Sequence, residues 1–330
     1  MVERWLARWR PLRVAAAVLV TSALVQGCDF VPEDTWGIGS VTWAGDGYVY
    51  FTHHFSERGV SEVWRVRPGG QPVAFVQTWP GRCAQDEPAV DVVRAFGGNG
   101  LAVALDCPDR PARVESIDLQ DRSGTRLFDA PDLFDVAVDP GGTRGYVEQG
   151  VRDCFSVAAF SDGAVRVLDV RVTTADGGWG LSEAYRAQAR PPGGQGCPGV
   201  GRAVGPATSA DGRVTAMLVS TSPEPGGNSL LSRFNWRVAV LDNATMAIRL
   251  VGPDLVTPSR LAVSADGSRV VLAGILGTDL AVLNVAGGGI ERLTVGDRNV
   301  TDPAFSPDGR TIAYNSDVKS IKFVPAPTTP

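Results

Sequence analysis

Residues 302–317 read DPAFSPDGRTIAYNSD, which is two short apolar segments joined by a polar turn. An Asp-Gly pair between apolar segments is a strong hairpin signal, because glycine adopts positive φ without steric cost. Clear copies of this pattern are AVSADGSRVVLA at 262–273, ATSADGRVTAML at 207–218 and VAVDPGGTRGYV at 136–147, and looser copies lie at 92–105 and 41–51. Six copies along one chain predict a repeat architecture.

The spacing of the turn glycines predicts which architecture this is. These glycines are Gly47, Gly100, Gly142, Gly212, Gly267 and Gly309, so the spacings are 53, 42, 70, 55 and 42 residues. A four-stranded propeller blade takes roughly 40–45 residues, so the shortest spacings are bare blades and the others carry loops. We therefore predict an all-β fold, a six-bladed β-propeller of four-stranded antiparallel blades over residues 41–325.

The turn sequence also resembles a known family. S-[PA]-D-G-[RS], present at 306–310, 264–268 and 209–213, is similar to the repeat of TolB-type six-bladed propellers, relatives of the tryptophan-aspartate repeat propellers. The resemblance covers the propeller only, because the chain contains nothing similar to the separate N-terminal α/β domain of TolB. TolB-type propellers bind a peptidoglycan-associated lipoprotein, but turn motifs do not carry that partner over to this chain.

The first 27 residues have the composition of an export signal. Four arginines and one glutamate precede the apolar segment 14–25, which is too short to span a bilayer core of roughly 30 Å. Val25-Gln26-Gly27-Cys28 resembles a bacterial lipobox, although Gln26 is less usual there. An uncleaved anchor and ordinary cleavage are the alternatives. We predict a signal peptide over 1–27 and an exported lipoprotein, held by acyl chains on Cys28 at the outer side of the cytoplasmic membrane, in the cell envelope.

Residues 28–40 are predicted to form a lipidated tether and a closing strand. The last repeat offers no fourth strand after 321–325, and a blade with a missing strand exposes unpaired backbone groups. We therefore expect a strand from about Phe30 to Trp36 to complete the last blade. Residues 326–330 are rich in proline and threonine, and we predict a disordered tail there.

Four cysteines besides Cys28 fit an oxidising compartment. Four cysteines allow three pairings. In the repeat frame Cys83 lies just before the inner strand of its unit and Cys107 just after the second strand. Cys154 follows the second strand of the next unit, and Cys197 precedes the inner strand of the one after. We predict the disulfides Cys83–Cys107 and Cys154–Cys197. The alternative, a metal site, lacks Cys-x-x-Cys spacing and a nearby histidine.

The predicted mature chain is acidic. Removal of residues 1–27, with four Arg and one Glu, takes the formal net charge from −5 to −8. An acidic balance without a basic stripe argues against nucleic-acid binding. The chain contains no Gly-x-x-x-x-Gly-Lys motif for phosphate, and we predict no cofactor.

Motifs for catalysis are missing from the sequence. His53 and His54 are the only histidines, so a three-histidine metal site is impossible, and there is no Gly-x-Ser-x-Gly elbow. The repeated turn aspartates invite comparison with calcium ligands. Their carboxylates are more simply explained as acceptors for the backbone amides of their own turns. We predict a protein that is not an enzyme and binds no metal.

The main insertion, 171–202, suggests where a partner binds. Long loops on rigid scaffolds often carry function. In the repeat frame this loop shares one face of the ring with the loops of three predicted disulfide cysteines. We predict a binding face there that includes Trp179, and we add His53 and His54, at the end of a strand of the first unit, as candidates.

The predicted function is that of a platform for an envelope protein or peptide. The alternative is a propeller hydrolase or lactonase with a carboxylate-bound metal in the central channel. Asp135, Asp302 and Glu87 lie near the starts of inner strands and are its candidate ligands. A purely structural envelope module is a third interpretation.

Overall fold

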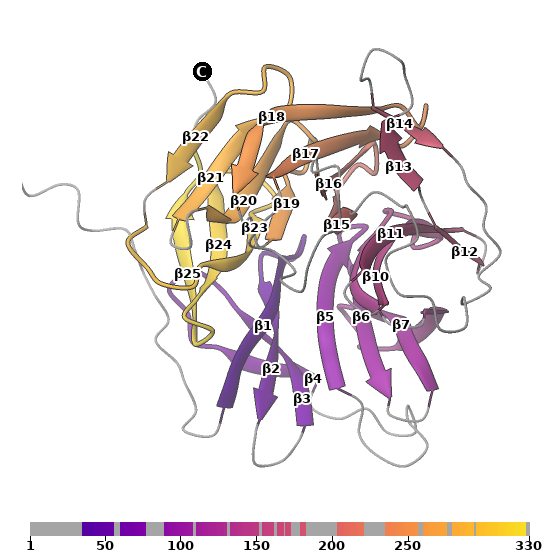
Figure 1. The fold of residues 1–330 in the computed structure, drawn as a ribbon. Coiled ribbons are helices and arrows are strands. Elements are labelled where there is room, and N and C mark those ends of the chain that lie inside the picture. Colours follow the sequence, from indigo (N-terminus) through magenta and orange to yellow (C-terminus); the bar gives the residue numbers. More distant parts are fainter. Residues whose placement is uncertain are drawn as a thin grey trace, which may run out of the picture.

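The computed structural model describes residues 35–55, 60–76, 89–107, 110–130, 133–151, 154–161, 164–167, 169–172, 179–182, 203–220, 235–256, 260–275, 279–293 and 295–327. Within these ranges the regular elements are β-strands, and six antiparallel sheets stand around a central axis (Figure 1). The predicted all-β, six-bladed propeller is confirmed.

The strands follow one another in chain order within each blade. Blades 1 to 3 are β1 (Thr35–Trp43), β2 (Val49–Phe55), β3 (Val60–Val66) and β4 (Val73–Val76); β5 (Ala89–Phe96), β6 (Gly100–Cys107), β7 (Arg110–Asp118) and β8 (Gly124–Ala130); and β9 (Leu133–Val138), β10 (Arg144–Val151), β11 (Cys154–Ser161) and β12 (Ala164–Val167). Blades 4 to 6 are β15 (Ala203–Thr208), β16 (Val214–Ser220), β17 (Asn235–Asp242) and β18 (Ile248–Val256); β19 (Arg260–Val263), β20 (Arg269–Ile275), β21 (Asp279–Asn284) and β22 (Ile290–Leu293); and β23 (Thr301–Phe305), β24 (Thr311–Ser316) and β25 (Ser320–Pro325).

A separate hairpin lies between blades 3 and 4. It consists of β13 (Asp169–Val172) and β14 (Trp179–Ser182), with Val172 opposite Trp179. This hairpin occupies the beginning of the insertion predicted over 171–202. Residues 183–202 lie outside the described part of the chain.

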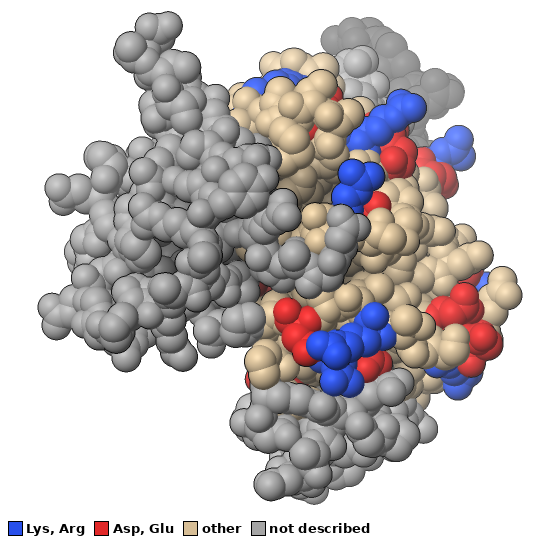
Figure 2. All heavy atoms as spheres, turned by 90° about the vertical axis from the view of Figure 1, so that its right-hand side faces the viewer, with Lys and Arg blue, Asp and Glu red and all other residues tan. Residues whose placement is uncertain are grey.

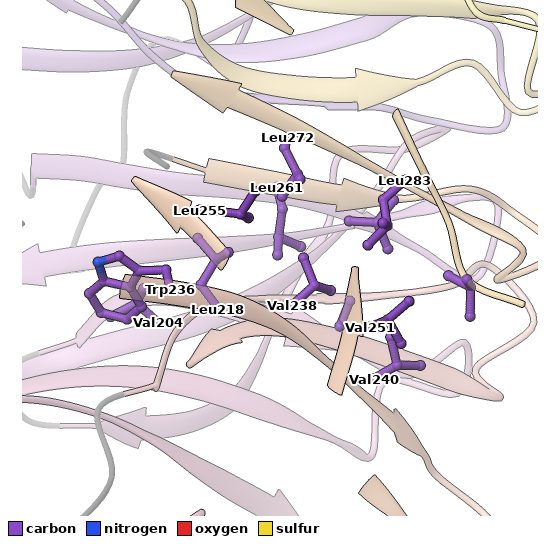
Figure 3. Close-up of a cluster of buried hydrophobic side chains, with 13 residues drawn as sticks. Val204, Leu218, Trp236, Val238, Val240, Val251, Leu255, Leu261, Leu272 and Leu283 are labelled. Atoms are coloured by element: carbon purple, nitrogen blue, oxygen red, sulfur yellow. The ribbon is translucent and has the colours of Figure 1, made fainter. Parts of the chain in front are cut away.

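The first strand of each blade lines the axis. These inner strands are β1, β5, β9, β15, β19 and β23, and each contacts the next around the ring, with β23 contacting β1. The side chains between blades form six buried apolar clusters, and each cluster combines residues of two neighbouring blades. Figure 3 shows the cluster between blades 4 and 5, around Trp236 and Leu272. A blade therefore completes its core only through its neighbours, as expected for a repeat fold.

The turn glycines explain how the blades approach so closely. Gly212, Gly267 and Gly309 have φ values of +72°, +71° and +68°. A Cβ on Gly212 would lie 2.6 Å from Pro140 Cδ of the preceding blade, and one on Gly267 would lie 2.9 Å from Val214 Cγ2. Both the backbone conformation and the space between blades therefore require glycine at these turns.

Blade 2 departs from the predicted turn. Positive φ falls on Gly97 and Gly98, whereas Gly100 is already the first residue of β6. The ring of Phe96 covers Gly100, where a Cβ would lie 2.8 Å from Phe96 Cζ. The prediction of Gly100 as the turn glycine of this blade was therefore wrong, and Gly97 and Gly98 take that role.

The ring closes between blades 1 and 6 without a shared sheet among the described strands. The amide of Ile38 donates to the carbonyl of Val318 at 2.7 Å, and Asn315 Nδ2 donates to the carbonyl of Ile38 at 2.7 Å. Blade 6 has three described strands. Thr35 and Trp36, the end of the predicted closing strand, belong to β1 of blade 1, because Thr35 pairs with Phe55. Residues 30–34 lie outside the described part of the chain.

The C-terminal boundary also differs from the predicted one. Ala326 is buried, and its amide donates to the carbonyl of Arg310 at 2.7 Å. Arg269 Nη1 donates to the carbonyl of Pro327 at 2.9 Å. The described fold therefore continues to Pro327, two residues past the predicted boundary.

The turn between β24 and β25 carries backbone strain that a substitution can relieve. Asp317 and Val318 have φ values of +55° and +53°, in a turn closed by a 3.1 Å hydrogen bond from the amide of Lys319 to the carbonyl of Ser316. Turns with two positive φ values favour asparagine or glycine, and a β-branched residue is strained there. We expect Val318→Asn to raise the free energy of unfolding by about 1 kcal/mol in urea titrations. Val73→Asn, at an exposed position in β4, is the control, and an equal effect of both would contradict the strain argument.

Candidate functional site

A cavity of about 290 Å³ lies on the propeller axis. Its walls come from all six blades, as the inner-strand residues Val41, Arg94, Ala137, Ala207, Leu261 and Ala304 show. The turns that follow the inner strands form its rim, among them Gly45, Pro140 and Pro307. We call the face of the ring that carries these turns the turn face, and the opposite face the strand-start face. Among the described residues that line it, most are apolar and Arg94 is the charged one.

The repeated turns hold the rim of this cavity. In blade 6, Ser306 Oγ donates to Asp308 Oδ1 at 2.6 Å, and the amide of Arg310 donates to the same oxygen at 3.0 Å. The amide of Thr311 then donates to Ser306 Oγ at 2.9 Å. Blades 4 and 5 repeat this arrangement through Ser209 with Asp211 and Ser264 with Asp266. The turn carboxylates therefore accept from their own turns, as predicted.

These hydrogen bonds change the acidity of the turn aspartates. The serine hydroxyls and the backbone amides lower the pKa of Asp266 and of Asp308. At Asp211, burial acts to raise the pKa, but the hydrogen bonds from Ser209 and Arg213 outweigh it and the pKa is lowered. Because the folded pKa lies below the unfolded value of 3.8, this contribution to stability is present above pH 3.8 and is lost as the pH falls through the folded pKa.

The triple variant Asp211→Asn, Asp266→Asn and Asp308→Asn tests this contribution. We expect its stability to fall less steeply than that of the parent protein as the pH drops below about 4. Thermal unfolding midpoints measured at several pH values provide the comparison. Parallel curves for the two proteins would show that the turn carboxylates do not contribute.

An ion network crosses the channel below the cavity. Asp135 of blade 3 accepts from Arg94 Nη2 of blade 2 and from Arg260 Nη1 of blade 5, both at 2.8 Å to Asp135 Oδ2. Arg260 Nη1 also lies 3.4 Å from Glu148 Oε2 of blade 3. The same Glu148 oxygen accepts from the amide of Gly205 of blade 4 at 2.7 Å. The network therefore joins blades on opposite sides of the axis.

Blades 1 and 6 also reach this network. Arg94 Nη1 donates to Ser40 Oγ of β1, which in turn donates to the carbonyl of Val93 at 3.0 Å. Asp302 of blade 6, at a φ of +46°, adds its negative charge near Arg260. Each of the six blades thus contributes a charged or polar group to this ion network or to its immediate surroundings.

Burial and neighbouring charges shift the pKa values of Glu148 and Arg260 in opposite directions. Burial raises the pKa of Glu148 above its ordinary value, and the positive charge of Arg260 opposes this rise. Burial acts to lower the pKa of Arg260, but the charges of Asp135, Glu148 and Asp302 outweigh it and raise that pKa. The Arg260 guanidinium therefore keeps its positive charge, which offsets the negative charges of the carboxylates around it.

The carboxylates predicted for a metal site are partly brought together. Asp135 and Asp302 both interact with Arg260, while Glu87 lies outside the described residues. The partner of these acids is an arginine, and among the described residues no group of three or more His, Cys, Asp or Glu side chains has the geometry to hold a metal ion.

The structure describes the residues of the predicted binding face only in part. His53 is 3% exposed and lies against Phe55 and Trp64, with ring centroids 4.3 and 5.1 Å away. His54 is partly buried, and its Nδ1 lies 2.8 Å from Ser61 Oγ. Trp179 is in β14, where the backbone alone is described. We leave His53 out of any binding surface because a partner cannot reach it.

The cysteines are described in part. Cys107 is 3% exposed and is disulfide-bonded. Cys154 begins β11, where its side chain is not described, and Cys28, Cys83 and Cys197 lie outside the described ranges. The pairings Cys83–Cys107 and Cys154–Cys197 and the lipidation of Cys28 therefore stay predictions.

Sequence reasoning missed Arg94, Glu148 and Arg260. One signal was available for Glu148, which is a charge inside the apolar strand segment GYVEQGV at 145–151. A charged residue at a buried strand position usually has a partner of opposite charge.

The side of the molecule that faces right in Figure 1 carries charges of both signs. Figure 2 shows basic and acidic side chains next to one another in small clusters over the described part of this side. Mixed pairs of this kind include Arg113 with Asp129, at 3.6 Å. Such pairs produce only a weak long-range field.

Within the described part of the chain, no helix combines the length and the apolar character that are needed to cross a membrane.

Comparisons with known proteins place the fold. No family model and no curated protein matches the sequence. Among solved structures, TolB from Acinetobacter baumannii matches with a TM-score of 0.50 and 18% identity over 81% of this chain, but only 56% of that chain is covered. A putative TolB from Agrobacterium tumefaciens matches with a TM-score of 0.50 and 13% identity, covering 88% of this chain and 91% of that chain.

An enzyme has the same architecture. Oligogalacturonate lyase from Vibrio parahaemolyticus matches with a TM-score of 0.51 and 14% identity, covering 90% of this chain and 92% of that chain. At such identities the likeness concerns the fold alone. The chain therefore has the TolB-like six-bladed β-propeller fold.

Proposed function

We propose that this chain is an exported lipoprotein whose propeller binds a protein or peptide in the bacterial cell envelope. The cavity on the axis is the main support for this proposal, because residues of all six blades line it. The arginine-rich signal segment and Cys28 support export and anchoring.

The cavity suits a small apolar group of a partner. Its walls are largely aliphatic, and its volume of about 290 Å³ is close to the lower limit, about 300 Å³, of small-ligand pockets. Hydroxyl groups of Ser209 and Ser306 lie in the rim turns but are engaged in them. We therefore place the partner's apolar anchor in the cavity and its polar contacts on the rim.

A cavity-filling variant tests this assignment. Ala207→Trp places a large side chain in the wall, and we expect it to reduce crosslinking to the envelope partner in living cells at least tenfold. Val73→Trp, on the outer strand β4, is the control. Equal recovery of the partner with both variants would exclude the cavity as its site.

The strand-start face is the binding face that the sequence predicted, and shortening the 171–202 loop tests it in the same assay. Loss of the partner on loop shortening, with no effect of Ala207→Trp, would move the site to that face.

The enzyme alternative rests on channel carboxylates. Asp135 and Asp302 both interact with Arg260, and this arginine would have to move away before a metal cation could bind to them. Metal analysis of the purified mature protein decides between the two functions: a stoichiometric divalent ion, lost in Asp135→Asn, would favour the enzyme.

A further inference from the structure

The start of β1 has a direct bearing on how the propeller would be oriented on a membrane. β1 is an inner strand that starts on the strand-start face and ends on the turn face, where Val41, Thr42 and Trp43 line the cavity. Its first half is fixed to the last blade: Gly37 lies against Val318, and the amide of Ile38 donates to the carbonyl of Val318. The start of β1 at Thr35 therefore lies on the strand-start face, beside the β24–β25 turn of blade 6.

The chain between Cys28 and this point is short. Thr35 is seven residues after Cys28. Seven residues span at most about 25 Å when fully extended. An acyl chain on Cys28 would thus hold the beginning of β1 within about 25 Å of the lipid surface.

This length is too small to let the turn face contact the membrane. The nine residues of β1 separate the two faces by about 26 Å. A tether from beside the β24–β25 turn would also have to pass around β25, which adds about 5 Å at a strand spacing of about 4.8 Å. The path of about 31 Å exceeds the reach of the tether.

We propose that the propeller is oriented on the membrane, with its strand-start face toward the lipid and its turn face, with the six-blade cavity, pointing away from it. This inference rests on the proposed lipid anchor at Cys28. It specifies the partner of the cavity as a protein or peptide that approaches from the side away from the anchoring membrane.

Quenching by lipids tests the orientation in the lipidated protein reconstituted in vesicles. One variant carries a fluorophore at Lys319→Cys, which is exposed in the β24–β25 turn on the strand-start face. The matched variant carries it at Ala210→Cys, which is exposed on the turn face beside the cavity. Labelling without reductant leaves disulfide-bonded cysteines unreactive. With nitroxide-bearing headgroup lipids, we expect several-fold stronger quenching at position 319 than at position 210.

Two controls make each outcome decisive. Insertion of twelve Gly/Ser residues after position 30 lengthens the tether, and we expect it to remove most of the difference. Arg213→Cys, also exposed, is a second turn-face site in case Ala210→Cys does not fold. Equal quenching at both faces, or stronger quenching on the turn face, in protein that floats with the vesicles overturns the orientation while leaving the anchor intact. Protein that does not float with vesicles overturns the anchor itself, and the orientation with it.

Discussion

Arg260→Met is expected to lower the free energy of unfolding by about 3 kcal/mol, measured by urea titration at neutral pH. The substitution removes the cation that lies between Asp135 and Glu148, whose side chains are 2% and 6% exposed. A buried carboxylate without its partner loses its Coulomb attraction while its desolvation cost remains. Because the Arg260 side chain itself is 30% exposed, we expect the lower end of the range for broken buried pairs.

The pH dependence of this loss identifies its cause. Burial already raises the pKa of Glu148, and removal of the nearby arginine raises it further. A folded pKa above the unfolded value means that the folded state takes up the proton first, so stability declines as the pH rises from the unfolded value through the folded one. We therefore expect the Arg260→Met penalty to shrink as the pH falls from neutral toward 5, and to shrink also in the double variant with Glu148→Gln.

An exposed arginine provides the control for this experiment. Arg213 is 85% exposed and lies 3.7 Å from Asp211, so Arg213→Met is expected to change stability by less than about 0.5 kcal/mol. Similar losses in the two variants, or a penalty for Arg260→Met that does not depend on pH, would show that the cross-channel network is not the source of the stability.

Trp236→Ala is expected to lower the free energy of unfolding by about 3–5 kcal/mol. The indole is 1% exposed and belongs to the apolar cluster between blades 4 and 5, with Leu255 and Leu272 (Figure 3). Truncation removes apolar contacts and leaves a cavity at a blade interface, where the backbones of two sheets prevent full collapse.

Trp236→Phe is the matched variant, because it keeps an aromatic ring of smaller size, and we expect a distinctly smaller loss. Calorimetry or urea titration measures both. A loss below 1 kcal/mol for Trp236→Ala would contradict the view that inter-blade clusters carry the stability of the ring.

The blades could be predicted from the sequence because the strands of each blade follow one another directly in the chain. The Asp-Gly turns place glycine at positive φ between strands that are close in sequence, and five of the six turns lie where the pattern put them. The exception at Gly100 arose because Gly97-Gly98 offers an equally flexible pair two residues earlier. Local chemistry alone does not choose between neighbouring glycines.

The channel could not be predicted in the same way. Arg260 and Asp135 are 125 residues apart, and Arg94 and Asp135 are 41 apart. Strand alternation indicates that a side chain points into a blade interface or toward the axis. It does not tell which of six blades supplies the opposite charge, since this depends on the diameter and closure of the whole ring.

The seam between the first and last blades also affects how the ring forms. Asn315 and Ile38, which are 277 residues apart, are bonded across it, so the seam requires nearly the whole chain to be present. Contacts between such distant residues are slow to form, because much of the chain must be ordered before they contribute. During synthesis, the apolar side of blade 1 that packs on blade 6, including Val41 and Phe51, stays uncovered until the last residues emerge. Among the blade surfaces, this side of blade 1 therefore waits longest for the blade that covers it. In the unfinished chain it can aggregate, and a holding chaperone would protect it.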